Sequence, residues 1–490
     1  MGEKRITSHI HFLVNNLSYP KADGRKSVLE LLNQIILKFP NEVLMKLSNL
    51  LFLALTLRLA NDPDPTCRGM VSELLVNLFQ CLTTKNSQRS RKSSQRSGPL
   101  GVFFGNTKKW LQDTEGKKKS LQLAGVQVAG ILARAVGSGF QAYAGDIIPL
   151  LIDIAVHAFE RNSKQRNADI NTQTNNSIDE NGDSEAWNLA HHTVVALTRA
   201  LKASPRHTAK SALKSSGIPL ATIAANGLRF PHVWVRTACA RLLGQCLAVR
   251  SEAVDEKSTD WIRETALSCC AGFVTDELIT TTLGEQLAKN ILFLATDQPD
   301  SDIIQAIAKR LGGIARKSKP KGISAMNLVS ISGEEKEPGW IIRRRSIIKV
   351  FGALVAKLEA ERSIPLLSII LRPMIMATED TPSSKNDNAP LKQLAQQVLD
   401  LIQKKVGDDH FATAYTQVRG EIMGKRAERA KRRKLEVVQD PQGAARRKRQ
   451  RTQKKIVAQK RQKAVRKAIR SGELPVARKR CQSRQKKRRV

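Results

Sequence analysis

The sequence predicts an all-α fold, and three of its features support this prediction. The chain has 490 residues, of which 41% are hydrophobic but only 4% aromatic, a balance that favours helix-on-helix packing over a sandwich or barrel. From Val235 to Leu247 the apolar residues recur with the period of an amphipathic helix. The same stripe returns near Val28, Val71 and Leu391. One kind of helix is therefore used repeatedly along the chain.

These helices need one another to be stable. A stripe of this kind buries apolar side chains worth on the order of 10 kcal/mol, while ordering a helix of about fifteen residues costs as much or more. Helices that must bury two faces against similar neighbours stack into a solenoid. An arginine also lies just ahead of an apolar run at Arg68, Arg236 and Arg343. We therefore expect a HEAT/armadillo-like helical-repeat solenoid with a basic, partly helical or disordered C-terminal tail.

The helix after Phe230-Pro231 serves as the reference repeat, because proline suits a first helical turn. Tryptophans lie near four expected helix starts, at Trp187, Trp234, Trp261 and Trp340. We expect them to be packing anchors, with ligand binding as the alternative. The structural repeat anchors predicted in the reference helix are Trp234, Arg236, Leu242 and Leu243.

Taken in order, the chain alternates between helical repeats and polar segments. Helical repeats are expected at 1–82, 99–161 and 185–407. Between them lie a basic loop at 83–98, which is a connector or a phosphate contact, and a polar insertion at 162–184, which is too poor in hydrophobic residues to fold. No polar capping segment precedes the first helix, so we expect residue 1 to be an internal position of a longer protein.

The C-terminal part carries most of the positive charge. Residues 425–490 hold 28 Lys and Arg against 4 Asp and Glu, which is +24 of the net charge of +38. We expect a basic helix at 408–437 and a basic tail at 438–490, the latter without Phe, Trp or Tyr. Clustered cations bind phosphates by releasing counterions, whereas a tail without aromatic rings has nothing on which bases can stack.

The tail is therefore predicted to bind RNA phosphates with little sequence preference, and its clusters also fit a nuclear import signal. A merely solvated basic tail is the alternative. The residues predicted for both roles are Lys431, Arg432, Arg433, Lys434, Arg446, Arg447, Lys448, Arg449, Lys486, Lys487, Arg488 and Arg489.

Other functional classes find little support. The seven cysteines show no Cys-x-x-Cys spacing and fit small core residues in a reducing compartment. The pairs His191-His192 and His9-x-His11 lack the companions that metal sites need. The longest apolar run, Leu50 to Leu57, is too short to span a membrane. We expect no enzyme activity, cofactor, metal, small-molecule substrate or membrane partner.

Several runs resemble a known family. They are Pro231 to Arg236 with Arg241 to Gly244, then Leu283 to Phe293, Leu391 to Ala395, and Arg433 to Pro441. In this order they resemble the C-terminal region of the small-subunit processome component 20 family, also called down-regulated-in-metastasis proteins, most firmly at 225–445. Family members are much longer, so the chain looks like a C-terminal portion or the product of a truncated gene model.

The resemblance implies a non-catalytic scaffold that works in pre-ribosomal RNA processing and small ribosomal subunit biogenesis. The partners that it implies are pre-ribosomal RNA, a small nucleolar ribonucleoprotein and processome proteins. The location that it implies is the nucleus, and within it the nucleolus. The alternative is a nuclear transport receptor or adaptor, since these proteins are also helical-repeat solenoids. Charge argues against a transport receptor, because a surface that binds basic cargo should be acidic. Residues 1–424 carry a net charge of +14.

Overall fold

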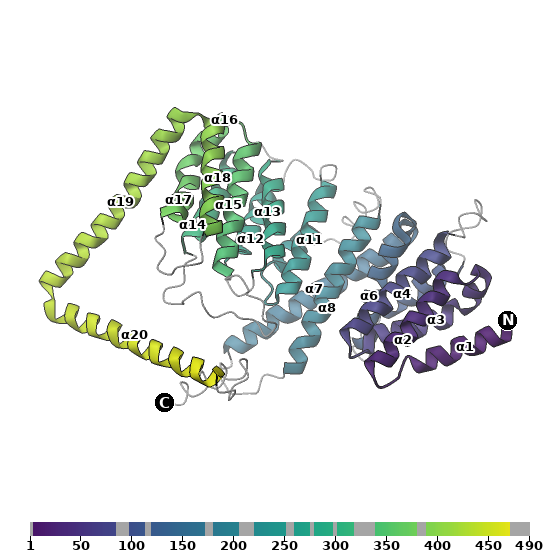
Figure 1. The fold of residues 1–490 in the computed structure, drawn as a ribbon. Helices are drawn as coiled ribbons and strands as arrows, with labels where there is room; N and C mark the ends of the chain where they lie inside the picture. Colours follow the sequence, from purple (N-terminus) through teal and green to yellow (C-terminus); the bar gives the residue numbers. More distant parts are fainter. Residues whose placement is uncertain are drawn as a thin grey trace. The chain divides into compact units, whose positions relative to one another are not determined.

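The computed structural model describes residues 3–84, 98–112, 119–171, 180–204, 220–250, 259–274, 279–296, 301–317, 339–379 and 389–470. Every regular element in these ranges is a helix (Figure 1), so the prediction of an all-α fold is confirmed. The chain divides into two compact units, Met1–Gln298 and Pro299–Val490.

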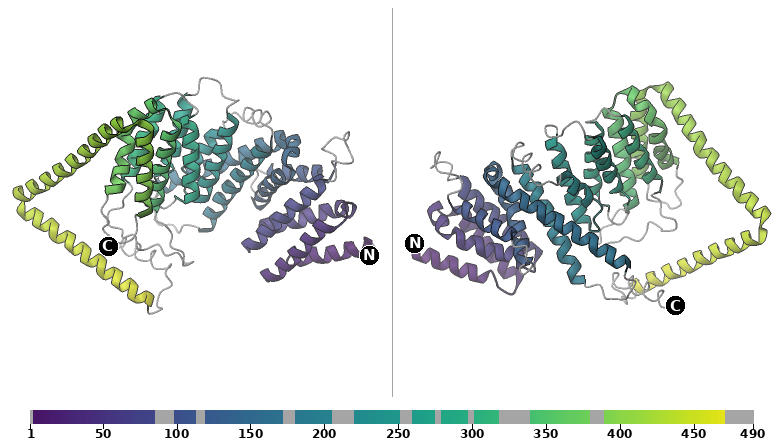
Figure 2. Two further views of the ribbon diagram at one scale, coloured as in Figure 1. Left: turned by 45° about the horizontal axis from the view of Figure 1, so that its top comes forward. Right: turned by 180° about the vertical axis from the view of Figure 1, so that it is seen from behind.

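The first unit is a stack of helical hairpins. Helices next to each other in the chain pack together, as α3 does with α4 and α7 with α8, and so do helices two apart, as α2 does with α4 and α6 with α8. Figure 2 shows the resulting layers from two further directions. The helices are α1 (Glu3–Asn16), α2 (Ala22–Lys38), α3 (Asn41–Asn61), α4 (Pro65–Thr84), α5 (Pro99–Leu111), α6 (Lys119–Val136), α7 (Gln141–Asn171), α8 (Glu180–Ala203), α10 (Leu220–Gly227), α11 (Val233–Arg250), α12 (Thr259–Ala271) and α13 (Thr281–Thr296), with a short 3-10 helix η1 (Gly137–Phe140).

The second unit repeats this packing and then continues into two long helices. Helix α15 packs on α18, α14 packs on α17, and α17 also contacts α18 and α19. At Gly352 of α15 an added Cβ would lie 3.0 Å from a methyl of Val398, so this glycine lets α15 and α18 approach closely. The helices are α14 (Ser301–Lys317), α15 (Gly339–Lys357), α16 (Ala360–Ser363), η3 (Ile364–Leu366), α17 (Leu367–Glu379), α18 (Ala389–Val406), α19 (Asp408–Gln439) and α20 (Pro441–Arg470).

Four aromatic residues of the first unit gather between α3, α4 and α5. Phe52 stacks on Phe103 with ring centroids 4.3 Å apart and on Trp110 with centroids 5.6 Å apart. The ring of Phe79 is tilted against that of Phe52, and their centroids are 6.1 Å apart. The three phenylalanines are fully buried. Aliphatic side chains fill most of the remaining core, as the composition predicts.

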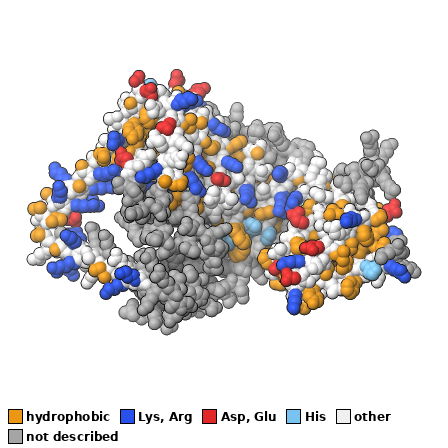
Figure 3. Space-filling model, viewed as in Figure 1, with side chains coloured by type: hydrophobic (Ala, Val, Ile, Leu, Met, Phe, Trp, Pro, Cys, Tyr) orange, Lys and Arg blue, Asp and Glu red, His pale blue; other side chains and the backbone are white. Residues whose placement is uncertain are grey.

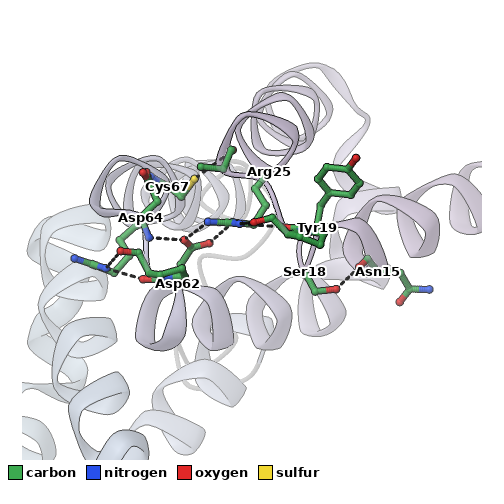
Figure 4. A network of polar contacts seen from close by, with 11 residues as sticks. Asn15, Ser18, Tyr19, Arg25, Asp62, Asp64 and Cys67 are labelled. Atoms are coloured by element: carbon green, nitrogen blue, oxygen red, sulfur yellow. Dashed lines mark hydrogen bonds and ion pairs between the residues drawn. The ribbon is translucent and has the colours of Figure 1, made fainter.

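Arginines hold the turns between neighbouring helices. In α2, Nη1 of Arg25 donates hydrogen bonds to the carbonyl oxygens of Tyr19 and Pro20, at 2.8 and 2.9 Å. Its Nε and Nη2 donate to the carboxylate of Asp62, both at 2.9 Å (Figure 4). Arg68 in α4 donates to the backbone carbonyl of Asp62 at 2.6 Å. The turn before α2 is thereby tied to the turn before α4.

The same device recurs at Arg236 in α11, whose Nε donates to the carbonyl oxygen of Leu228 at 2.6 Å. A first-turn arginine points back over the turn before its helix, where the carbonyls of the preceding helix end need donors. In the sequence each of these arginines follows a proline by five residues. The pairs are Pro20 and Arg25, Pro63 and Arg68, and Pro231 and Arg236.

The structure differs from the sequence prediction at the polar insertion. Helix α7 continues to Asn171 and α8 already begins at Glu180, so the backbone is helical at 162–171 and 180–184. Once a helix is nucleated by packing, each further residue adds a backbone hydrogen bond, which favours continuation even without an apolar face. Residues 172–179, like most of the predicted basic loop, lie outside the described ranges.

Two stretches, Asn41–Asn61 and Ser120–Glu160, are long and apolar enough to cross a membrane by length and composition alone. Both stretches are longer than the longest apolar run that the sequence predicts, which ends at Leu57. In the structure both belong to the packed hairpins of the first unit, where Leu44, Leu51 and Leu55 of α3 are fully buried. Packing on two faces within the repeat explains their apolar character.

Candidate nucleic-acid interface

The basic C-terminal arm, which we define as 427–470, begins where helix α19 extends beyond the packed helices of the second unit. The first half of α19 is fixed to α17: Val418 and Ile422 are buried, with exposures of 1% and 6%. Around them, Arg419 and Arg426 pair with Glu379 at 3.0 and 3.3 Å. These half-exposed ion pairs add little stability but fix the direction of the helix.

Beyond this root, the first predicted cluster lies free of the repeats. Lys431, Arg432, Arg433 and Lys434 are all exposed, and none of them forms an ion pair with another residue that the structure describes. Successive residues of a helix are rotated by about 100°, so four in a row point to all sides of α19. Phosphates can therefore approach this cluster from any direction.

A sharp corner separates α19 from α20. Helix α19 ends at Asp440, and the next residue, Pro441, opens α20. The carboxylate of Asp440 accepts a hydrogen bond from the backbone N–H of Gly443 at 2.8 Å, which caps the new helix. Arg447 donates to Glu436 and, at 3.2 Å, to Asp440. This arginine is thus engaged in the corner, whereas its predicted companions Arg446, Lys448 and Arg449 are exposed.

Helix α20 is the most basic element of the described chain. Its 30 residues contain 13 Lys and Arg and no Asp or Glu. Exposed pairs such as Arg446 with Arg449 and Lys460 with Lys463 are three residues apart, so like charges are neighbours and repel. A polyanion would relieve this repulsion. Figure 3 shows the blue Lys and Arg side chains along the arm.

The remaining predicted phosphate-binding residues lie outside the described ranges. These are Lys486, Lys487, Arg488 and Arg489, together with most of the Ser-rich basic loop. The interface that the structure describes therefore consists of the exposed clusters on α19 and α20.

Of the predicted repeat anchors, three lie in the interior and one does not. Leu242 and Leu243 are fully buried, and Arg236 is 3% exposed. Trp234 is 58% exposed, so its ring does not belong to the core, and truncating it should not create a cavity. The apolar stripe of α11 starts at Val235, and the preceding residue lies about 100° away from it, which places the indole at the rim.

Sequence reasoning missed the root of the arm. Glu379 and its partners Arg419 and Arg426 come from segments 40 and 47 residues apart, and no local pattern links such distant positions. A partial signal was present: Arg419 and Arg426 are seven residues apart and so share one face of α19, next to Val418 and Ile422.

Burial keeps three cysteine thiols and the imidazole of His192 uncharged at neutral pH. Burial raises the pKa of the Cys239 and Cys269 thiols and raises that of Cys246 to about 12. Burial lowers the pKa of His192 to about 4, helped by the neighbouring His191. No group of three or more His, Cys, Asp or Glu side chains in the described ranges is placed to hold a metal ion.

Comparison with solved structures relates the fold to the karyopherins. Kap95p, from a structure with RanGDP, superposes with a TM-score of 0.50 at 12% identity, covering 84% of this chain and 44% of Kap95p. Kap121p bound to Pho4p gives a TM-score of 0.44 at 13% identity, covering 90% of this chain and 41% of Kap121p. At this identity the likeness to Kap95p shows a shared HEAT-repeat fold.

Sequence comparison finds similar proteins in two fungi and a matching protein family. U3 small nucleolar RNA-associated protein 20 of Schizosaccharomyces pombe is 25% identical over 464 residues, covering 91% of this chain and 16% of the relative. The protein of the same name in Saccharomyces cerevisiae is 23% identical over 451 residues, covering 90% and 16%. This chain thus spans about one sixth of the length of these relatives. The family described as small subunit processome component 20 homolog, C-terminal, matches residues 122–465, which is more than half of the chain, and the chain therefore belongs to this family.

Proposed function

We propose that the chain is a non-catalytic scaffold of the small-subunit processome that acts in pre-rRNA processing and small ribosomal subunit biogenesis. In this role its basic arm binds RNA phosphates. Its partners would be pre-ribosomal RNA, a small nucleolar ribonucleoprotein and other processome proteins, and its place the nucleolus. Family membership and the names of the two fungal relatives support the assembly and its location.

One observation supports the RNA-binding part of this proposal: the arm consists of exposed helical segments of α19 and α20 whose lysines and arginines have few acidic partners. The arm, 427–470, contains 18 Lys and Arg and 3 Asp and Glu. Two of these acids, Glu436 and Asp440, share a single partner, Arg447. The rest of the charge is therefore open to phosphates, and each cation that meets a phosphate releases a counterion.

The experiment is a salt titration of RNA binding by the full chain. With about eight phosphates neutralised, the logarithm of affinity should fall against the logarithm of salt with a slope of roughly −6 to −7. Replacing Lys431, Arg432, Arg433 and Lys434 with Gln should flatten this slope by about 3, because each lost contact removes about 0.7–0.9. Scrambling the RNA sequence should change little.

A matched control removes the same charge from the repeats of the second unit. Lys309, Arg310, Lys404 and Lys405 are also exposed, and their replacement with Gln should leave the slope unchanged. Equal effects of the two variants would mean that RNA senses only total charge. A full slope in the arm variant would move the binding surface away from α19.

The nuclear-transport alternative rests on the fold alone, because Kap95p is only 12% identical to the chain. The comparisons therefore add no support for it beyond the shared repeat architecture.

A further inference from the structure

An aromatic cluster lies on the first unit, away from the arm sequence. We define the Trp234 cluster as Trp187 and His191 of α8 together with His232 and Trp234 at the start of α11. The rings of Trp187 and His232 stack in parallel, with centroids 4.1 Å apart and 6° between planes. Trp234 stands nearly perpendicular to both, at 5.5 Å from Trp187 and 5.4 Å from His232. His191 approaches Trp234 at 6.1 Å.

This cluster presents one ring to solvent on a rigid support. Trp234 is 58% exposed, whereas Trp187, His191 and His232 are half-buried. Helices α8 and α11 pack directly on each other, so the supporting rings belong to two fixed elements. An exposed indole held by three neighbouring rings loses little conformational freedom when it binds a flat ligand.

The cluster lies in a positive environment. After burial, the charges that lower the pKa of His191 include Arg241 and Arg199, and His232 also contributes. Burial lowers the pKa of His232 as well. The imidazole rings are therefore neutral at physiological pH and stack as aromatic rings. A cationic guest would be repelled by the two arginines, whereas an anionic one would be attracted.

We propose that Trp234 is a stacking platform for an unpaired base of single-stranded RNA, whose backbone phosphate meets Arg241. Every base has a π-face, so such a platform tolerates any sequence. Arg241 is exposed and lies seven residues after Trp234, two helical turns or about 10 Å along the same face of α11. The choice of RNA as the ligand rests on the proposed function, but the residues involved differ from those of the arm.

This site would supply what the arm lacks. The segment 425–490 contains no Phe, Trp or Tyr, so it neutralises phosphates on any strand, paired or unpaired. A base must be unstacked to lie on Trp234, so the platform discriminates in favour of single strands. The two contacts thus have separate signatures, one in the salt dependence and one in the preference for unpaired RNA.

The test compares full-chain variants on one RNA strand, unpaired and annealed to its complement. The strand carries a fluorescent 2-aminopurine base, whose emission falls when it stacks on an aromatic ring. Trp234→Ala should weaken single-strand binding between about fivefold and about a hundredfold, following the value of one stacked base. It should also reduce the quenching, leave duplex binding unchanged, and keep the salt slope, because the indole is neutral.

Two further variants serve as controls. Trp234→Phe keeps a ring and should retain most of the affinity and the quenching. Leu57→Ala removes another apolar side chain that is also 58% exposed, and it should bind RNA as the parent chain does. Circular dichroism checks that each variant keeps its helices.

The inference is overturned if Trp234→Ala binds the single strand like the parent chain, which would point to a protein contact for this ring. It is also overturned if single strand and duplex weaken equally. The proposed phosphate-binding arm is judged separately, by the slope of the variant with Gln at 431–434. A flattened slope with an unaffected Trp234→Ala would leave the arm standing and remove the platform.

Discussion

Replacing Arg236 with Met should loosen the turn between α10 and α11. The arginine is 3% exposed, and its Nε donates a 2.6 Å hydrogen bond to the carbonyl oxygen of Leu228, just beyond the end of α10. Methionine is long enough to keep most of the packing of the arginine stem, so the change removes mainly the guanidinium. Arg241, exposed on the same helix, offers a matched control.

Two opposing effects set the magnitude. A hydrogen bond from a charged donor contributes about 1.5–3 kcal/mol, and the carbonyl left behind has no replacement donor on methionine. Removing a buried charge relieves part of its desolvation cost, but this relief makes such a change neutral only when both partners are replaced. The loss of the hydrogen bond should therefore outweigh the relief of desolvation and lower the free energy of unfolding by about 2 kcal/mol.

This cost can be read both globally and locally. For a unit the size of Met1–Gln298, about 2 kcal/mol corresponds to a fall in Tm of about 3 °C. The local readout is hydrogen exchange of the amides of Leu228, Arg229 and Phe230, which donate to the three preceding carbonyls at 3.1–3.2 Å. We expect roughly thirtyfold faster exchange at these amides in Arg236→Met. Unchanged protection there, or an equal Tm loss in Arg241→Met, would refute the role of the guanidinium.

Two further predictions concern the same unit. In Gly227→Ala the new Cβ would overlap Sγ of the buried Cys239 and lie 3.2 Å from Cζ of Phe159, so we expect a loss of about 1–3 kcal/mol from overpacking. Gly145→Ala, at an exposed helical position with no atom within 4 Å, should instead gain about 0.5–1 kcal/mol by chemical denaturation. His192→Gln should reduce acid destabilisation between about pH 6.5 and about pH 4. The native state holds this histidine neutral, with a pKa of about 4, while the unfolded chain binds a proton below about pH 6.5, so stability falls as pH falls through this window. Denaturation midpoints of both chains at pH 7.5 and pH 4.5 test this, and equal losses would contradict it.

The sequence predicts helices well where the apolar stripe is local. The stripe of α11 from Val235 to Leu247 places Leu242 and Leu243 correctly in the interior, because the helical period alone decides which side chains share a face. The prediction that Trp234 is a packing anchor is wrong, because it rests on the size of the ring and not on its position, one residue before the stripe. The period would have placed it at the edge.

Contacts between distant segments account for most of what could not be predicted. Trp187 and His232 stack although 45 positions separate them, and Arg25 reaches Asp62 over 37 positions. A single sequence contains no periodic signal for such pairs. The charge of α20, in contrast, is purely compositional, so its exposure could be predicted, whereas the capture of Arg447 at the corner with Asp440 required coordinates.

The structure places the arginines of this chain in two different settings. At Arg25, Arg68 and Arg236 the guanidinium meets carbonyl oxygens of the turn before its own helix. The carbonyls of Asp62 and Leu228 lie one residue past the end of the preceding helix, where the backbone lacks internal donors and the helix dipole favours a cation, and those of Tyr19 and Pro20 lie further along the turn. An arginine placed there donates its hydrogen bonds within the fold.

Arginines of the arm have no such turn to close. Arg432 and Arg433 lie in the middle of α19, where backbone carbonyls already accept the helical hydrogen bonds, so their guanidinium groups remain in solvent. A proline precedes each of these three turn-closing arginines by five residues and fixes the turn over which the side chain closes, whereas Arg432 and Arg433 follow no such proline. Arg446 also follows a proline, Pro441, by five residues, yet it is exposed and the turn is held by Arg447 and Asp440 instead. The spacing alone is therefore insufficient: at Arg25, Arg68 and Arg236 the side chain reaches a carbonyl of the turn before its helix, whereas before α20 Arg447 holds the turn through Glu436 and Asp440.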